Sequence, residues 1–413
     1  MRRLGFTATA LSLGIGLAAL LVLGVGLSAA RAEDAEPTTV TALQAADGSP
    51  IGNAAVTTTF MVAGGEYHSC AVTDEGGPLQ CWGKNVSGQL GDDSNDQSET
   101  PVGVNGLSTG IKAVDGGYDH SCAVTSGGGV KCWGANSKGQ LGNGYWTQSL
   151  VPVDVKNDDD SPISDAVAVS TGQDHSCALT SGGNVKCWGY NGYGQLGDNS
   201  DANRNKAVVV TTTTGSPLTG IKAIDLGDAH SCALTTGGSV KCWGSGIYGK
   251  LGDGNGIAHY EMMPVNVIGL SGVATISAGF HHTCAVLTDR TAKCWGYNSN
   301  GQLGNGLVNM FYATPQMVSG LTKGVAIAAG REHTCALLST GAAKCWGDNY
   351  YGQLGDNKAS GGTSNVPVDV SGLASGSTAL AIGLGNDHSC AIFDGYGVKC
   401  WGSNSNGQLV DDS

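Results

Sequence analysis

The sequence contains little charge, few aromatic residues and few prolines. Charged residues make up 13% of the 413 residues, aromatic residues make up 6%, and proline occurs 10 times. Basic residues are the scarcer of the two charge types, because 21 Lys+Arg stand against 34 Asp+Glu and give a net charge of −13. A surface this acidic repels nucleic acid and anionic membranes. We therefore expect no nucleic-acid partner, and any protein partner should have basic character.

Helical periodicity is also missing, and only one long apolar run occurs. After the first thirty or so residues, no stretch repeats apolar residues at a spacing of three to four. Glycine is very abundant instead, at 68 residues. Without a dominating short pattern, this composition favours many short strands joined by glycine-containing turns, and it argues against a disordered or collagen-like chain.

The single long apolar run lies at the N-terminus and has the features of a secretory signal. Arg2 and Arg3 precede an apolar segment from about Leu11 to Leu27, and residues 30–32 (Ala-Arg-Ala) have the small-x-small pattern of a cleavage site. We interpret residues 1–32 as a cleaved signal peptide and the mature protein as secreted or extracytoplasmic. If the segment stayed uncleaved, its length would allow it to anchor the chain in a membrane.

Seven copies of one repeat fill the rest of the chain. Each copy carries H-[ST]-C-A, then a turn that in most copies contains glycine, then C-W-G, and most continue as N-x-x-G-Q-L-G. The first cysteines of successive copies are 51 to 55 residues apart, a period typical of a repeat architecture. The repeat histidines are His68, His120, His175, His230, His282, His333 and His388.

Each copy contains four short segments that favour antiparallel strands. In the third copy they are residues 166–169, 175–180, 184–188 and 207–211. Four strands per copy and seven copies predict an all-β fold, a seven-bladed β-propeller spanning residues 61–413. The first strand is small and apolar, which suits a crowded inner position, and the last often begins with proline, which suits an outer edge.

The seventh copy ends before its outer strand. The N-terminal segment 37–41 (Pro-Thr-Thr-Val-Thr) resembles an outer strand. We expect it to pair onto the last blade as that missing strand and to close the ring, because an open ring exposes two unpaired edges. Residues 33–60 are therefore interpreted as a linker that contains a ring-closing strand.

All 14 cysteines fall inside the repeats, two in each copy. A three-residue turn at 181–183 places Cys177 opposite Cys187, and directly opposed residues have Cα atoms about 4.5–5.5 Å apart, which a disulfide spans. An exported chain with an even number of local pairs favours seven disulfides, each worth about 3 kcal/mol in the chain-entropy model. Reduced buried thiols, or a zinc site using His and both Cys, are the alternatives. The expected pairs are Cys70–Cys81, Cys122–Cys132, Cys177–Cys187, Cys232–Cys242, Cys284–Cys294, Cys335–Cys345 and Cys390–Cys400.

The combined pattern resembles the regulator of chromosome condensation repeat family. The segments G-x-x-H-[ST]-x-A-[LV] and W-G-x-N-x-x-G-Q-L-G carry the resemblance over residues 61–413. The resemblance implies a seven-bladed propeller used as a binding platform. The family includes a nuclear exchange factor for a small GTPase, a plant ultraviolet-B photoreceptor and secreted bacterial β-lactamase inhibitors.

Two of these activities do not transfer to this sequence. The exchange factor needs a basic face and a protruding insertion, whereas this chain is acidic and its repeats differ little in length. The photoreceptor carries tryptophan two positions before several repeat histidines. Here those positions hold Glu66, Tyr118, Gln173, Asp228, Phe280, Arg331 and Asn386. The secreted binding proteins fit the expected compartment and architecture best.

The variable residues just before each histidine are the expected binding site. In an up-and-down blade, the loop before the histidine and the N-x-x-G-Q-L-G loop lie on one face of the propeller. Aromatic residues among carboxylates at the mouth of a rigid ring suit a basic protein or peptide. The alternative is that exposed loops are simply polar. The candidate partner-binding residues are Glu66, Tyr67, Tyr118, Asp119, Asp174, Phe280, His281, Arg331 and Glu332.

The sequence therefore favours a non-enzymatic, monomeric extracellular propeller that binds a protein or peptide without a cofactor or metal. An extracellular enzyme using the acidic mouth near His281 and Glu332 is one alternative, and nucleotide exchange on a small GTPase is another. We expect no catalytic residues, because no nucleophile and base stand in a recognisable arrangement. Residues 92–96 and 198–201 are rich in Asp and Asn but lack the spacing of an EF-hand, so we interpret them as solvated turns rather than calcium loops.

Overall fold

The computed structural model describes residues 38–39, 61–72, 77–256, 258–358, 361–373, 379–393 and 397–409. The signal peptide and most of the linker predicted from the sequence lie outside these residues. All the described residues belong to one compact unit, Glu36–Ser413. Within the described part of the chain, no helix has the length and apolarity that crossing a membrane would need.

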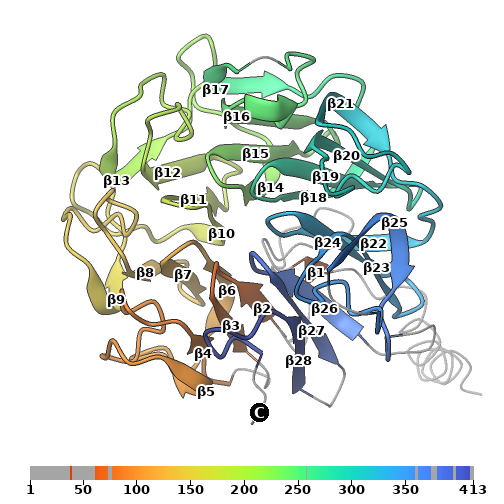
Figure 1. The fold of residues 1–413 in the computed structure, drawn as a ribbon. Helices are drawn as coiled ribbons and strands as arrows, with labels where there is room; N and C mark the ends of the chain where they lie inside the picture. The colour runs from red at the N-terminus through yellow and green to blue at the C-terminus, as the bar shows by residue number, and fades with distance from the viewer. Residues whose placement is uncertain are drawn as a thin grey trace, which may run out of the picture. The chain divides into compact units, whose positions relative to one another are not determined.

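Seven four-stranded sheets form the seven blades predicted from the sequence, and Figure 1 shows them following one another around a ring. In each blade the strands lie in chain order from the inside outward, apart from the seventh blade discussed below. The inner strands are β2 (Met61–Gly64), β6 (Ile111–Gly116), β10 (Ala166–Thr171), β14 (Ile221–Leu226), β18 (Val273–Ala278), β22 (Gly324–Ala329) and β26 (Ala379–Leu384).

The second and third strands of each blade form the hairpin that carries the repeat motif. The second strands are β3 (His68–Val72), β7 (His120–Thr125), β11 (His175–Thr180), β15 (His230–Thr235), β19 (His282–Leu287), β23 (His333–Leu338) and β27 (His388–Phe393). The third strands are β4 (Gln80–Gly83), β8 (Val130–Gly134), β12 (Val185–Gly189), β16 (Val240–Ser245), β20 (Ala292–Tyr297), β24 (Ala343–Asn349) and β28 (Gly397–Gly402).

In the first six blades, five of the six outer strands contain a proline, as the edge argument predicts, and that of the third blade contains none. These six strands are β5 (Ser98–Gly103), β9 (Ser149–Asp154), β13 (Arg204–Val209), β17 (Tyr260–Asn266), β21 (Phe311–Met317) and β25 (Gly362–Asp369). The described residues contain one short 3-10 turn, η1 (Ile247–Gly249), in the fourth blade.

The seven predicted disulfides are confirmed, and they occupy the predicted register. Each pair is directly opposed across the hairpin, as Cys177 is opposite Cys187. The Cα atoms of the pairs are 4.0–4.1 Å apart, and none of the cysteines in the described ranges is free. The thiols are therefore used inside the blades, which removes them from the alternative zinc site.

One backbone carbonyl joins each blade to the next. The carbonyl of Gln89, in the G-Q-L-G loop of the first blade, accepts hydrogen bonds from Trp133 Nε1 at 2.8 Å and Ser121 Oγ at 2.9 Å in the second blade. His68 Nε2 in turn lies 2.8 Å from Ser121 Oγ. Because the single hydroxyl proton goes to the carbonyl, the histidine must donate from Nε2. The partner of the histidine is therefore the hydroxyl of the neighbouring blade.

The same three bonds recur at every junction. Those between the later blades join His120, His175, His230, His282 and His333 to the hydroxyl of the next blade. The histidine ring also needs a glycine three positions earlier, because a Cβ on Gly172 would lie 2.3 Å from the ring of His175 and 2.4 Å from the carbonyl oxygen of Gly227. This close approach explains why every copy has the glycine of G-x-x-H.

The ring closes through these same contacts. Trp82 Nε1 of the first blade donates to the carbonyl of Gln408 in the seventh at 2.9 Å, and His388 Nε2 lies 2.9 Å from Ser69 Oγ. The inner strands β2 and β26 also pack against each other. The first and last blades therefore meet as any other two blades do.

The N-terminal strand reaches the last blade but not at the predicted place. Strand β1 (Thr38–Thr39) pairs in parallel with β26, the innermost strand, with Thr38 opposite Ala381. Among the described residues, β28 is consequently the outermost strand of this blade. The prediction of an outer closing strand is wrong in this respect. The inner strand β26 also lies beside β2, the next strand that the structure describes.

The buried histidines predict that the fold loses stability in acid. Burial lowers the pKa of His68, His120, His175, His282 and His333 to about 3 and that of His388 to about 4, and it lowers the pKa of His230 well below 6.5. The unfolded chain therefore binds protons between about pH 6.5 and pH 3 that the folded chain excludes, and stability falls as the pH drops through this window. Denaturant unfolding at pH 7.5, 6 and 5, with the disulfides intact, should give a steadily lower free energy of unfolding.

A single substitution tests the source of this effect. His175→Asn removes one titrating group, so the slope of unfolding free energy against pH between 4 and 6 should fall by about 1.4 kcal/mol per pH unit relative to the unmodified protein. A stability curve that stays flat from pH 7.5 to 5 would contradict neutral histidines at the junctions.

Candidate functional site

The loops before the repeat histidines surround the axis, and backbone hydrogen bonds link five of the seven loops to the next one. On one half, Glu66 N–H donates to the Gly117 carbonyl at 3.1 Å, and Gln173 N–H donates to the Asp228 carbonyl at 3.2 Å. On the other half, Phe280 N–H donates to the Gly330 carbonyl at 3.2 Å and Arg331 N–H to the Asn386 carbonyl at 3.3 Å. The predicted residues therefore share one rim, which we call the mouth.

A small cavity opens on the axis inside the mouth. It has a volume of about 90 Å³ and is lined by the inner strands and the loops that follow them, including Glu66, Tyr118, Asp228, Phe280 and Asn386. On the same measure a single water needs roughly 10–15 Å³. The cavity can therefore take a few waters or the tip of one long side chain, and a larger partner must bind across the mouth.

Two aspartates of the inner strands join neighbouring blades, and one of them, Asp115, lines the cavity. Asp115 Oδ2 accepts from Thr171 N–H at 2.8 Å, and Asp225 Oδ2 accepts from Ala278 N–H at 3.0 Å. Burial, and then the charge of Asp225, raises the pKa of Asp115 well above its usual value. These side chains are buried among backbone donors, so they serve the junction between inner strands.

On the side of the first two blades, the candidate residues gather around Lys84. Its ammonium lies 2.9 Å from Asp119 Oδ1 and stands over the rings of Tyr67 and Tyr118, at 5.3 and 5.6 Å from their centroids. Asn386 Nδ2 donates to Glu66 Oε1 at 3.0 Å. The structure thus brings Glu66, Tyr67, Tyr118 and Asp119 together as predicted.

On the opposite side, aromatic rings surround His281. Its ring centroid lies 4.5 Å from that of Phe280, 5.4 Å from that of Tyr248 and 5.9 Å from that of Tyr297. Arg331 stands over the Phe280 ring at 5.5 Å. Burial lowers the pKa of His281 to about 3, so the ring is neutral and a poor proton carrier near neutral pH.

Lys250 is the most unusual charged group near the mouth. It replaces the glutamine of G-Q-L-G in the fourth blade and is 1% exposed. Its ammonium lies 3.8 Å from Asp228 Oδ2. Burial lowers the pKa of Lys250 to about 8 and raises the pKa of Asp228. The junction survives this replacement because only the backbone carbonyl of Lys250 is needed there.

The carboxylates of the mouth exceed its cations. Burial raises the pKa of Asp174, Asp228 and Asp387 and raises that of Glu66 to about 7. Asp119, Glu332 and Asp348 lie close enough to act on these four groups, so seven carboxylates stand against four cations. The cations are Lys84, Lys138, Lys250 and Arg331. An added positive charge near a carboxyl group whose pKa is raised by burial stabilises its ionised form and lowers that pKa.

Sequence reasoning missed a second layer of variable positions. The residue after C-W-G supplies Lys84, Tyr190, Tyr297 and Asp348, and the residue before the next glycine supplies Lys138 and Tyr248 among others. Asn300, from the second of these positions, donates to Glu332. The available signal was their variation from copy to copy inside an otherwise constant motif.

The Asp-rich loops use their carboxylates internally. Asp92 Oδ1 accepts from Asn85 Nδ2 at 3.1 Å and from Ser94 Oγ at 2.9 Å, and Asp198 does the same with Asn191 and Ser200. Arg204 also binds Asp198, with Nε 3.0 Å from Oδ2. This arrangement agrees with turns rather than calcium sites.

The chain matches one family model for a whole domain and two family models for a single repeat. A family model described as the RCC1-like domain matches residues 15–319, and models of the regulator of chromosome condensation (RCC1) repeat match residues 325–353, 344–392 and 380–408.

Individual proteins also match. The ultraviolet-B receptor UVR8 of Arabidopsis thaliana is 31% identical over 318 residues, covering 76% of this chain and 69% of the receptor. The E3 ubiquitin-protein ligase HERC2 of Mus musculus is 32% identical over 340 residues, which cover 80% of this chain but 7% of the ligase. The structure of Prp20p from Saccharomyces cerevisiae superposes with a TM-score of 0.70 at 22% identity, covering 81% of this chain and 83% of Prp20p.

The raised pKa of Glu66 predicts that this residue lowers the free energy of unfolding at high pH. Between about pH 4.5 and 7 the folded protein keeps a proton on Glu66 that the unfolded chain releases, so its contribution to stability is full below 4.5 and is lost as the pH rises through 7. Glu66→Gln should therefore stabilise the protein at pH 8, by on the order of 1–2 kcal/mol, and much less at pH 5. Denaturant unfolding of both proteins at each pH measures the difference.

A second variant checks the cause. The Tyr118 hydroxyl bonds to Glu66 and favours its ionised form, so Tyr118→Phe should move the transition to higher pH. A gain from Glu66→Gln that is equal at pH 5 and pH 8 would show that Glu66 does not titrate in this range.

Proposed function

Because this chain belongs to the family of RCC1-like β-propellers, we propose that it is a non-enzymatic binding protein whose mouth takes a basic segment of a protein or peptide. Members of this family bind proteins or act as exchange factors for small GTPases. Prp20p, for example, has binding properties toward Gsp1p and histones. We propose for this chain only that it binds a protein or peptide, and not that it binds the partner of any one relative.

The single observation that carries the proposal is the excess of partly buried carboxylates around the mouth. Their raised pKa values come first from burial, and the nearby cations compensate only part of the charge. An arriving Lys or Arg side chain would lower these pKa values, and because the pKa of Glu66 is raised to about 7, binding beside Glu66 would release a proton near neutral pH. The cavity on the axis has room for the tip of one such side chain.

The aromatic residues supply the apolar part of the surface. Tyr67, Tyr118 and Phe280 are partly exposed on the rim, and each already has a cation over its ring. Aromatic faces attract ammonium and guanidinium groups and provide the packed anchors typical of protein interfaces. We propose that Glu66, Asp119, Asp174, His281, Arg331 and Glu332 complete this surface.

We further propose that the protein works outside the cytoplasm as a monomer. Seven disulfides suit an oxidising compartment. The proposed export signal, residues 1–32, is consistent with this compartment. Residues 33–60 would then be the linker to the propeller, and a membrane would be involved only if the signal remained attached.

Capture from the native extracellular fluid tests the proposed surface. The double variant Tyr118→Ala/Phe280→Ala should retain less than about a tenth of the partner captured by the unmodified protein, because both halves of the rim lose an aromatic anchor. Quantitative mass spectrometry of the bound fraction, at low and high salt, gives the measurement. Basic proteins should dominate, and salt should weaken their capture.

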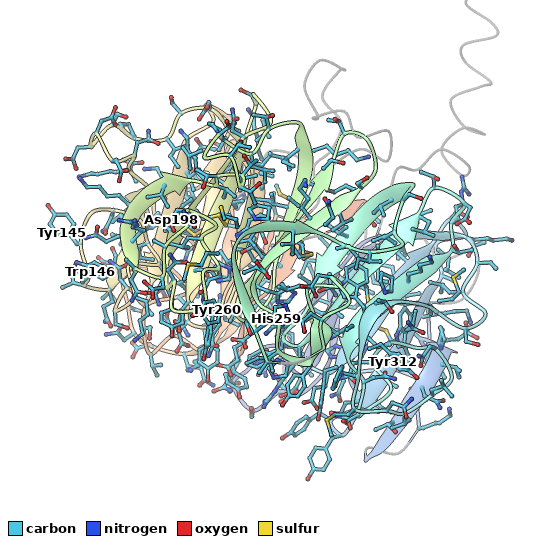
Figure 2. All side chains as sticks on the ribbon, turned by 90° about the horizontal axis from the view of Figure 1, so that it is seen from above. Tyr145, Trp146, Asp198, His259, Tyr260 and Tyr312 are labelled. Atoms are coloured by element: carbon cyan, nitrogen blue, oxygen red, sulfur yellow. A yellow bond between two sulfur atoms is a disulfide. The ribbon has the colours of Figure 1, made fainter. Side chains whose placement is uncertain are left out.

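A matched control removes aromatic surface elsewhere. Tyr145 and Trp146 are 62% and 47% exposed, and Figure 2 shows them at the edge of the molecule. Tyr145→Ala/Trp146→Ala should capture as much partner as the unmodified protein. Equal capture by the mouth variant and the unmodified protein would reject the mouth as the binding face.

A further inference from the structure

The fourth blade departs from the repeat at a point where the other blades agree. In five other copies, the asparagine of N-x-x-G-Q-L-G donates to an Asp or Asn seven residues later, as Asn191 Nδ2 does to Asp198 Oδ1 at 3.1 Å. The fourth copy has Gly246 at this position and Asp253 seven residues later. The fourth copy therefore keeps the carboxylate of Asp253 but lacks the asparagine amide that would donate to it.

His259 takes the place of the missing asparagine. A Cβ on Gly246 would lie 2.2 Å from Cε1 of the His259 ring, so the imidazole occupies the space of the absent side chain. Its Nε2 lies 2.9 Å from Asp253 Oδ2, and Gly246 N–H donates to the His259 carbonyl at 2.8 Å. An imidazole therefore faces the carboxylate where five other blades present an amide.

A second carboxylate joins this pair from the outer strand. Glu261 on β17 is opposite Gly244, which is the register that Arg204 on β13 has opposite Gly189. In the third blade this position holds the cation that binds Asp198. In the fourth blade a carboxylate stands there instead, so the position that neutralises the aspartate in one blade adds negative charge in the next.

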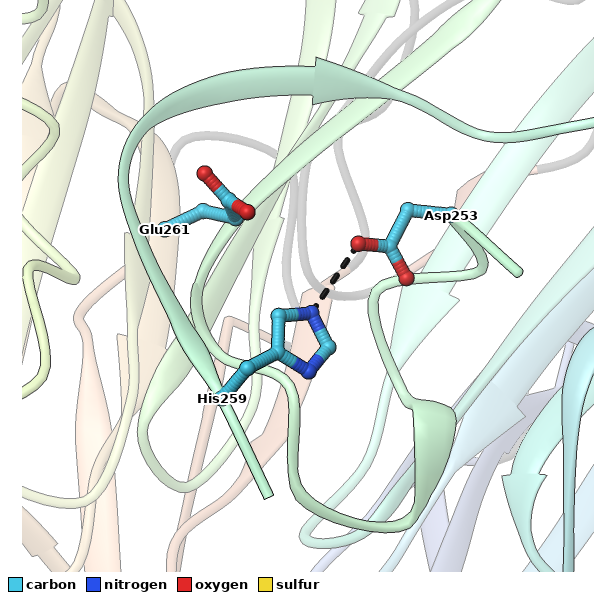
Figure 3. A group of neighbouring side chains, drawn as sticks. All are labelled: Asp253, His259 and Glu261. Carbon is cyan, nitrogen blue, oxygen red and sulfur yellow. Dashed lines mark hydrogen bonds and ion pairs between the residues drawn. The ribbon is translucent and has the colours of Figure 1, made fainter. Parts of the chain in front are cut away.

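The three side chains converge on one point, as Figure 3 shows. One ligand atom from each of Asp253, His259 and Glu261 lies within 4.8 Å of the other two. Ligand atoms about 2.1 Å from a tetrahedral metal are about 3.4 Å apart, so closing the site requires only small rotations of the side chains. The side chains of His259 and Asp253 are 14% and 13% exposed, which leaves a route from solvent.

From this convergence we propose that Asp253, His259 and Glu261 form a binding site for a divalent transition metal of the zinc class. One imidazole and two carboxylates are ligands that Zn²⁺ accepts, whereas Ca²⁺ and Mg²⁺ favour sites made of oxygen alone. Three protein ligands leave the fourth tetrahedral position to water or to a side chain of a partner. The metal would tie the loop that holds Asp253 to the outer strand of the blade.

No sequence pattern indicates this site, because the spacing D-x5-H-x-E matches no common zinc motif. The competing explanation is purely structural: His259 replaces asparagine as a partner of Asp253, and Glu261 is incidental. The two explanations differ in the role of Glu261, since a hydrogen bond between His259 and Asp253 does not need it.

Isothermal titration of the chelator-treated, tag-free protein with ZnCl₂ tests the proposal. We expect one equivalent to bind saturably and to raise the melting temperature, with no such binding of CaCl₂ or MgCl₂. Glu261→Gln should weaken Zn²⁺ binding at least tenfold, and His259→Asn should abolish it while retaining a donor for Asp253. Absence of saturable binding to the unmodified protein, or equal affinity after Glu261→Gln, would overturn the proposal.

Two variants serve as controls, and each gives one blade the residue that the other blade has at the equivalent outer-strand position. Glu261→Arg copies the third blade and should abolish Zn²⁺ binding while leaving the melting temperature of the metal-free protein unchanged or higher, since an arginine then faces Asp253. Arg204→Glu places a second carboxylate beside Asp198 but leaves Asn191 as an amide. It should create no new site, and a second bound equivalent in this variant would show that the imidazole is not required.

Discussion

Each junction between blades depends on one backbone carbonyl in the G-Q-L-G loop. It accepts from the tryptophan indole and from the serine or threonine hydroxyl of the next blade, and that hydroxyl accepts in turn from a histidine of the first blade. The donors and acceptors are buried, so losing any one of them would leave a polar group without a partner. Since the same bonds join the seventh blade to the first, closure of the ring follows from the repeat itself.

This arrangement separates what must stay constant from what is free to change. A carbonyl is present whatever the side chain, so Lys250 replaces glutamine without disturbing the junction it serves. The residues just before each histidine are likewise held by backbone bonds, which leaves their side chains free to differ. Variation therefore collects around the mouth, where Lys84, Phe280 and Arg331 come from different blades, and in the fourth blade, where His259 fills the place of an asparagine.

Much of the fold could be predicted because its signals are local. The hairpin register that opposes Cys177 and Cys187 follows from the turn between them, and the outer position of the proline-containing strands follows from the missing N–H of proline. The position of β1 could not be predicted, because both the inner and the outer edge of the last blade can accept a two-residue strand. The partners of Lys84 could not be predicted either, since Asp119 and Tyr118 belong to the next blade.

Local sequence patterns were enough to determine the number of blades, the order of their strands, the seven disulfides and the rim on which the variable residues lie. These features repeat every fifty or so residues and depend on neighbours within one copy. Only the folded arrangement determines which charges meet at the mouth, how deeply Glu66 and Lys250 are buried, and that Asp253, His259 and Glu261 converge. Such contacts join side chains across loops and blades, and their energies depend on burial and distance, which a linear pattern does not contain.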